Sequence, residues 1–177
     1  MAIACALSIT LVTTIDEHRL LDIAHRAIRS EVLGVPAETY SSGEPPRPVF
    51  VTIERSGKVL GCRGDLTARC SDLEQEVAMA ARAACAHDPR YRPLTPTDLN
   101  GALVTVTVVE EQVRITGVDD LQPSEGLVLR LGDRTGVVLP WEGRDQRTRL
   151  RWAYRKAGIT EGRAVQLFRL KAERFRG

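Results

Sequence analysis

Two short β-runs separated by only two residues constrain the fold of this chain more than any other feature. Residues 49–55 and 58–63 are rich in β-branched and other apolar side chains, and Ser56-Gly57 between them suits a two-residue turn. A turn this tight pairs the two strands antiparallel and fixes their register. If the hairpin is regular, Cys62 opposes Val51 and shares its face with aliphatic neighbours.

Helices and further strands alternate along the rest of the chain. Two helices begin with capping boxes, Thr14 to Glu17 and Ser71 to Glu74, in which a hydroxyl and a carboxylate satisfy each other's backbone amides. Short turns between neighbouring strands favour an antiparallel sheet over a doubly wound parallel one. We therefore predict an α+β fold, a mainly antiparallel sheet with flanking helices. The expected elements are helices near 14–33, 71–87 and 145–157, and strands at 103–109, 127–131, 137–139 and 165–170.

The beginning of the chain is uncharged but does not resemble a signal peptide. Residues 1–15 have no positively charged segment and are too few to cross a bilayer. We expect them to form an N-terminal extension or a first strand at 6–13, ahead of one domain at 16–177. The four cysteines form no CxxC pair and no regular framework. We therefore expect reduced thiols, a cytoplasmic location and no membrane association.

The end of the chain is basic. Residues 143–177 contain nine Arg and two Lys against three acidic residues, a local charge of +8, which leaves −6 on residues 1–142. Basic and aromatic residues interleaved on helix 145–157 can bind phosphates and stack on bases. Arginines near a helix C-terminus are also favoured by the helix dipole, and aromatic residues fill cores. Nucleic acid therefore stays open as a partner but is not favoured. The basic residues of this helix are Arg147, Arg149, Arg151, Arg155 and Lys156.

Gly61-Cys62-Arg63-Gly64 is the segment with the most distinctive chemistry. The two glycines let a ligand or another backbone approach the sulfur closely, and a neighbouring cation favours the nucleophilic thiolate. Successive side chains of a regular strand point to opposite faces, so Arg63 is expected across the sheet from Cys62. A thiol among aliphatic residues is a small packed hydrophobe. The residues alone leave two interpretations of Cys62 open, a structural thiol and a functional one.

No other chemical site is complete in the sequence. His18 and His25 are seven residues apart on one helix, too far for the i, i+4 spacing that chelates a metal. His87 is typical of a helix C-terminal cap, and the remaining cysteines are expected to be structural. We predict no metal site and no bound cofactor.

The order of motifs resembles the AMMECR domain family, named for the AMME syndrome candidate region and also called the A component of the AmmeMemoRadiSam system. The resemblance starts with residues 50–53, which lead into 61–64, and extends over about 16–175. The further matches are Asp88-Pro89-Arg90-Tyr91, Pro93-Leu94-Thr95-Pro96, Asp98-Leu99, residues 136–140 and Arg155-Lys156-Ala157-Gly158-Ile159.

The resemblance implies a larger and a smaller lobe with a cleft near the Gly-Cys segment. It also implies two partners, a Memo-like protein similar to extradiol dioxygenases and a radical SAM enzyme. It implies no settled activity, since a thiol-dependent enzyme and an RNA- or protein-linked regulator are both proposals for the family. On the matching positions, Cys62 is the candidate catalytic residue. The candidate substrate-binding residues are Gly61, Arg63, Gly64, Asp88 and Arg90.

This chain departs from the usual family motif in the position of its charge. Family members typically carry Leu-Arg-Gly-Cys-Ile-Gly, whereas here Leu60 precedes the glycine and Arg63 follows the cysteine. The charge has therefore moved to the opposite face of the strand. Any assistance to the thiol must come from Arg63, Arg90 or another base. Two functions follow as expectations: a thiol-dependent enzyme or accessory component acting with the two partners, and a non-catalytic binding module for protein, metabolite or RNA.

Overall fold

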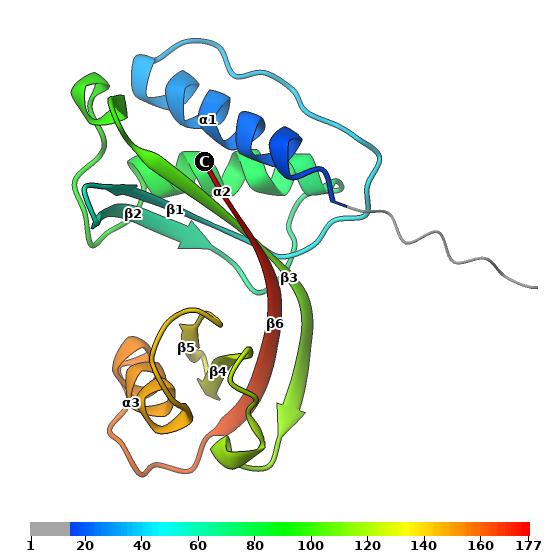
Figure 1. Cartoon of the computed structure of the whole chain (residues 1–177), viewed down its shortest axis with the longest axis vertical. Coiled ribbons are helices and arrows are strands. Elements are labelled where there is room, and N and C mark those ends of the chain that lie inside the picture. The colour runs from blue at the N-terminus through cyan, green and yellow to red at the C-terminus, as the bar shows by residue number, and fades with distance from the viewer. Residues whose placement is uncertain (1–14) are drawn as a thin grey trace, which may run out of the picture.

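The computed structural model describes residues 15–177, and its frame is one six-stranded sheet in which every pair is antiparallel (Figure 1). The strand order is β2-β1-β3-β6-β4-β5. The predicted α+β class is correct, while the predicted strand at 6–13 lies outside the described residues. The strands are β1 (Val49–Arg55), β2 (Lys58–Gly64), β3 (Leu103–Ile115), β4 (Gly126–Leu131), β5 (Arg134–Val138) and β6 (Gln166–Arg176). The helices are α1 (Glu17–Leu33), α2 (Leu73–Ala86) and α3 (Gln146–Ala157), with short 3-10 turns η1 (Pro96–Leu99) and η2 (Val118–Asp120).

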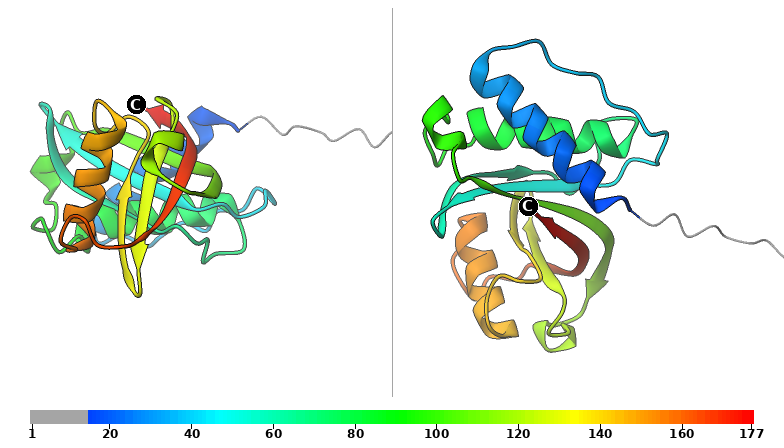
Figure 2. Two further views of the ribbon diagram at one scale, coloured as in Figure 1. Left: turned by 90° about the horizontal axis from the view of Figure 1, so that it is seen from below. Right: turned by 45° about the horizontal axis from the view of Figure 1, so that its top comes forward.

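Strands β3 and β6 are long, and they join two lobes. In the larger lobe they continue the β1–β2 hairpin beneath α1 and α2, and in the smaller lobe they carry β4, β5 and α3 (Figures 1 and 2). The sequence predicted only the first half of β3 and of β6. The polar pair Glu110-Glu111 interrupts the apolar alternation there, because the β3–β6 register shifts at a bulge between Val109 and Glu111.

A helix packs onto each edge strand of the sheet at a glycine. A Cβ atom on Gly61 of β2 would lie 2.0 Å from the carbonyl oxygen of Ala84 in α2, and one on Gly136 of β5 would lie 2.0 Å from that of Ala153 in α3. Only glycine allows such a close approach of helix and strand backbones. The alanine-rich face of α2 completes this contact.

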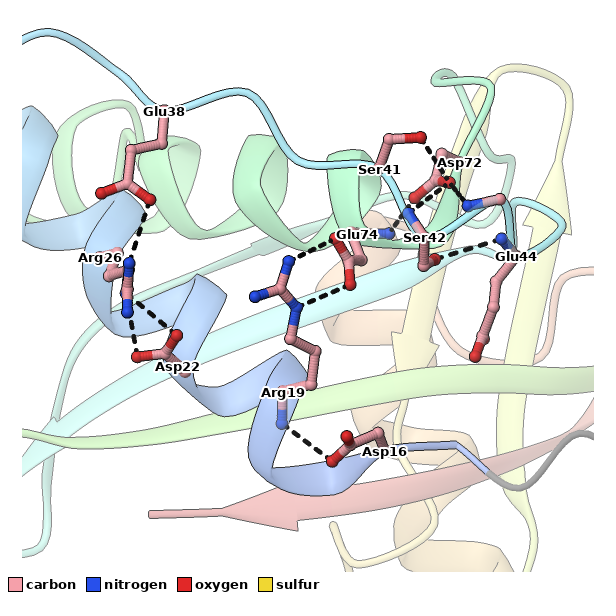
Figure 3. Close-up of polar contacts among 11 residues, drawn as sticks. Asp16, Arg19, Asp22, Arg26, Glu38, Ser41, Ser42, Glu44, Asp72 and Glu74 are labelled. Carbon is pink, nitrogen blue, oxygen red and sulfur yellow. Dashed lines mark hydrogen bonds and ion pairs between the residues drawn. The ribbon is translucent and has the colours of Figure 1, made fainter.

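The helix starts differ from the predicted capping boxes. The N-cap of α2 is Asp72 rather than Ser71, and the N-cap of α1 is Asp16, while Thr14 lies outside the described residues. Asp72 caps the Glu74 amide at 2.8 Å and also accepts from the amides of residues 42 and 43, a tertiary contact that no local pattern shows (Figure 3). The helices α1 and α3 end at the left-handed glycines Gly34 and Gly158.

An ion pair ties the two helices of the larger lobe together. Arg19 of α1 donates two hydrogen bonds to the nearly buried carboxylate of Glu74 in α2, at 2.8 and 3.1 Å (Figure 3). The face of the sheet beneath these helices is filled by the aliphatic side chains Val49, Val51, Ile53, Val104, Val106 and Val108. Across residues 15–177, no helix is both long and apolar enough to span a membrane.

Candidate functional site

A β-bulge at Leu60 decides which face of the sheet carries the thiol. The β1–β2 register shifts between Ile53 and Glu54, so Cys62 pairs with Thr52 and not with Val51. The predicted regular register is therefore wrong beyond the bulge, and a slip of one residue turns every following side chain to the other face. Cys62 points away from α1 and α2, toward the face that we call the inner face of the sheet.

The inner face is lined by a row of polar side chains that crosses four strands. Cys62 of β2 pairs with Thr52, Thr52 pairs with Thr105 of β3, and Thr105 pairs with Arg176 of β6. The hydroxyl of Thr52 lies 3.1 Å from the Cys62 sulfur, a distance at which it can donate a hydrogen bond. Cys62 is half-buried, so its thiol is in a polar and partly open setting. Thr52 was not among the predicted site residues, although a polar residue inside an apolar strand is the signal for it.

The side chains of Asp88 and Arg90 hold the backbone of Cys62 from outside the sheet. Asp88 Oδ2 accepts from the Cys62 amide at 2.9 Å, and Arg90 Nη2 donates to the Cys62 carbonyl oxygen at 2.6 Å. The two side chains also pair with each other, at 2.9 Å from Arg90 Nε to Asp88 Oδ1 and 2.8 Å from Nη2 to Oδ2. Since β2 is an edge strand, its outer amide and carbonyl groups have no partner strand, and these two side chains satisfy those of Cys62.

The electrostatics of this pair keep Asp88 ionised. Burial alone would raise the pKa of Asp88, but hydrogen bonds from Arg90 and from the Cys62 amide outweigh it, and the pKa lies below its ordinary value. The pKa of Arg90 is raised above its ordinary value, first by its hydrogen bond to Asp88 and further by the charge of the same carboxylate. Arg90 is therefore a cation held against the backbone of Cys62.

Arg63 and the two glycines of the motif have packing environments of their own. Arg63 lies across the sheet from Cys62, as strand alternation predicts, and lines a cavity of about 140 Å³ with Glu76 of α2. Gly61 lies against Ala84, and a Cβ atom on Gly64 would meet the Phe50 ring at 2.5 Å. The groups that approach these two glycines are therefore protein atoms, and the side chain that the motif directs to the inner face is that of Cys62.

The other described thiols are poor nucleophiles. Burial raises the pKa of Cys85 to about 12, and burial together with Glu76 raises that of Cys70. Their structural interpretation therefore stands, while Cys5 lies outside the described residues. Within residues 15–177, no group of three or more His, Cys, Asp or Glu side chains is arranged to hold a metal ion.

A pocket of about 500 Å³ opens where the two lobes meet on the inner face. The larger lobe contributes Phe50 and residues 64–67, and the smaller lobe contributes Arg130, Gly132, Thr135 and Val137. Phe50 and Val137 also pack against one apolar cluster that includes Val109, Val128 and Leu170, so side chains from both lobes share this cluster. The lining reaches Gly64 but does not include Cys62. Arg130 was not among the predicted site residues, although an arginine inside the apolar strand at 127–131 is the sequence signal for this pocket.

The basic helix exposes less charge than its sequence predicts. Arg149 is buried, with 4% of its surface exposed, and donates hydrogen bonds to backbone carbonyls around it. Lys156 pairs with Glu142, and the Arg155 guanidinium lies 5.7 Å from the centre of the Trp152 ring. The basic surface of α3 is thus smaller than its sequence predicts, because these three side chains are buried, paired or packed on a ring.

The fold and this arrangement define a class of two-lobed α+β domains, in which one curled antiparallel sheet carries helices outside and a thiol inside. Residues 19–177 match the model of the AMMECR1 family. The chain belongs to the AMMECR1 family, as the order of its motifs predicts.

Relatives of the chain occur in bacteria and archaea. A protein of Thermotoga maritima is 33% identical over 132 residues, covering 72% of this chain and 76% of its own length. A protein of Methanosarcina barkeri is 28% identical over 144 residues, covering 73% of this chain and 71% of its own. The crystal structure of the uncharacterised protein PH0010 from Pyrococcus horikoshii shares the fold, with a TM-score of 0.76, 24% identity and 89% of each chain covered.

Proposed function

We propose that this chain is a thiol-dependent accessory component in which Cys62 is the group that engages the substrate. The observation that carries the proposal is the placement of the Cys62 sulfur on the inner face, 3.1 Å from the Thr52 hydroxyl. Arg90 and Asp88 fix the backbone that presents it. The Thr52 hydroxyl can donate a hydrogen bond to this sulfur, and Arg90 binds the carbonyl oxygen of the same residue.

The accessory role follows from the surroundings of the thiol, because no free base lies beside it within residues 15–177. Asp88 is ionised, but its two oxygens already accept four hydrogen bonds, from Arg90 and from the Cys62 amide. The histidines His18 and His25 lie on α1, and His87 caps α2, so all three belong to the helix side of the sheet. A reacting thiol must lose its proton to some base. We propose that a partner or the substrate supplies this base.

The family resemblance supplies the candidates for that partner, a Memo-like protein and a radical SAM enzyme. In this proposal the inner face with Cys62 is the cleft at which the chain meets them. A partly open thiol also suits the reducing cytoplasm, where we place the protein.

The test is association with the Memo-like and radical SAM proteins of the same genome, followed by size-exclusion chromatography. We expect alkylation of Cys62 with N-ethylmaleimide to abolish co-elution, because the adduct fills the inner face. Cys62→Ser keeps the shape of the surface and should co-elute with the partners. Cys70→Ser, in which Cys62 is still alkylated by N-ethylmaleimide, should not co-elute after this treatment. Co-elution that survives alkylation, or no association of the unmodified chain, would contradict the proposal.

A second function, a non-catalytic binding module, is favoured by one observation. Arg147 and Arg151 of α3 are exposed, and neither forms an ion pair within the part of the chain that the structure describes. Binding of an RNA oligonucleotide that weakens with salt and is lost on Arg147→Glu and Arg151→Glu would support this function. No binding in low salt would reject it.

A further inference from the structure

The pocket between the lobes has both an apolar and a polar lining. Its volume of about 500 Å³ falls within the range of small-molecule sites. Phe50, Leu66 and Val137 come from the apolar cluster that joins the lobes. The polar part of the lining includes Arg130 and the hydroxyl-bearing Thr67 and Thr135. This combination suits a ligand with an apolar body and a polar head.

Arg130 is held in place but keeps most of its hydrogen-bonding capacity. Its guanidinium carbon lies 5.0 Å from the centre of the Phe168 ring, and Nη2 donates to Gln112 Oε1 at 3.3 Å. Across residues 15–177, no carboxylate forms an ion pair with it. A guanidinium has five N–H donors in a planar fork that matches carboxylate and phosphate oxygens. Stacking on an aromatic ring fixes that fork before any ligand arrives.

The charges around Arg130 leave room for an anion. Asp65 is an acidic residue of the same pocket, but its carboxylate is bonded to the guanidinium of Arg69. Arg130 also lines a second hollow of about 450 Å³ formed with residues 164–166, and the lining of that hollow contains no acidic side chain. An oxyanion at Arg130 would therefore not face an unpaired carboxylate in either hollow.

The pocket lies next to the thiol along one strand. Gly64 lines the pocket and follows Cys62 by two residues on the same face of β2. Two residues of a strand span about 7 Å. A ligand anchored at Arg130 would have its apolar body along Phe50 and its other end toward the Cys62 sulfur.

From these contacts we propose that the inter-lobe pocket binds a small molecule made of an oxyanion, carboxylate or phosphate, on an apolar body, with Arg130 as the anion-binding residue. The proposal names the substrate class of the Cys62 site and so rests on the proposed function. Arg130 is the residue that selects the charge, and the Phe50 wall selects the apolar part.

Isothermal titration of the full chain with phenyl phosphate, benzoate and phenol tests this proposal. We expect saturable binding of at least one of the two anions, and binding of phenol weaker by about tenfold or more. Arg130→Gln should weaken anion binding by about tenfold or more. Arg134→Gln is the matched control: it removes the same charge from the next strand, where the guanidinium donates to the Gly158 carbonyl, and it should leave the affinity unchanged.

Three results would overturn the proposal: no saturable binding of either anion, equal affinity for phenol, or equal losses in Arg130→Gln and Arg134→Gln. Repeating the titration with Cys62→Ser separates this inference from the proposed function. We expect the anion to bind Cys62→Ser as it binds the unaltered chain, because the thiol is not the anion site. Association with the partner proteins is measured independently of this titration, so either idea can fail alone.

Discussion

The guanidinium of Arg90 donates a hydrogen bond from Nη2 to the carbonyl oxygen of Cys62 across 2.6 Å, at the open edge of the sheet. The Asp88 carboxylate, paired with the same guanidinium, accepts the Cys62 amide at 2.9 Å. Both backbone groups of Cys62 that point out of the sheet edge, the amide and the carbonyl, are therefore hydrogen-bonded to side chains. This arrangement blocks pairing with a further strand and fixes the position of the sulfur.

Asp88→Asn should destabilise the larger lobe by about 2 kcal/mol at neutral pH, because it removes a charged acceptor from Arg90 and the Cys62 amide. Urea unfolding measures the change. Asp119→Asn, an exposed carboxylate on η2, is the control and should shift stability by no more than about 0.5 kcal/mol. Equal stabilities of the two variants would show that the Asp88 contacts contribute little.

The difference between the unaltered chain and Asp88→Asn should depend on pH in a defined direction. The folded-state pKa of Asp88 lies below its ordinary value, so its contribution is complete above the unfolded pKa of about 3.9. It is lost as the pH falls below that value and through the folded pKa. The free energies of unfolding of the unaltered chain and of Asp88→Asn should therefore differ at about pH 7 and be nearly equal at about pH 3. A difference that grows on acidification would contradict the assignment.

Gly61→Ala should destabilise the protein by about 3 kcal/mol or more, since the added methyl group would lie 2.0 Å from the Ala84 carbonyl oxygen. Thermal unfolding measures the loss. Gly117→Ala is a matched control, because its Cβ would meet no heavy atom within 4 Å and its φ is −154°. If both variants unfold at the same temperature, α2 does not pack on β2 at Gly61.

Arg149→Met should destabilise the smaller lobe by about 3 kcal/mol. The side chain donates to the carbonyls of Gln122, Pro123, Pro140 and Glu142, and methionine would leave these acceptors buried without donors. Arg147→Met removes an equal charge from the exposed face of the same helix and should cost no more than about 0.5 kcal/mol. A larger loss of stability in Arg147→Met than in Arg149→Met would contradict the structural role of Arg149.

Local chemistry made much of the fold predictable. The Ser56-Gly57 turn adopts positive φ at both residues, as a two-residue hairpin requires, and Gly34 and Gly158 end their helices. The second hairpin turn is shorter than predicted, since β5 already begins at Arg134. Pattern reasoning places elements well wherever the deciding residues are neighbours in sequence.

The geometry around Cys62 could not be predicted from the sequence. The bulge at Leu60 accompanies the contact of Gly61 with α2, a tertiary contact between distant segments, and it turned Cys62 to the face opposite the expected one. The roles of Asp88 and Arg90 also need the third dimension, because 26 and 28 residues separate them from Cys62. Arg130 was not predicted as a site residue, because the apolar side chains around it indicate only a strand.

The reactivity of the Cys62 thiol in the folded chain tests the central claim most directly. The measurement is alkylation by iodoacetamide at about pH 8, in a Cys5→Ser background, followed by peptide-resolved mass spectrometry. We predict that Cys62 reacts about tenfold faster or more than Cys70 and Cys85, whose pKa values are raised, and that Thr52→Val slows it. Alkylation of Cys62 as slow as that of buried Cys85, or only after unfolding in urea, would contradict a functional thiol on the inner face.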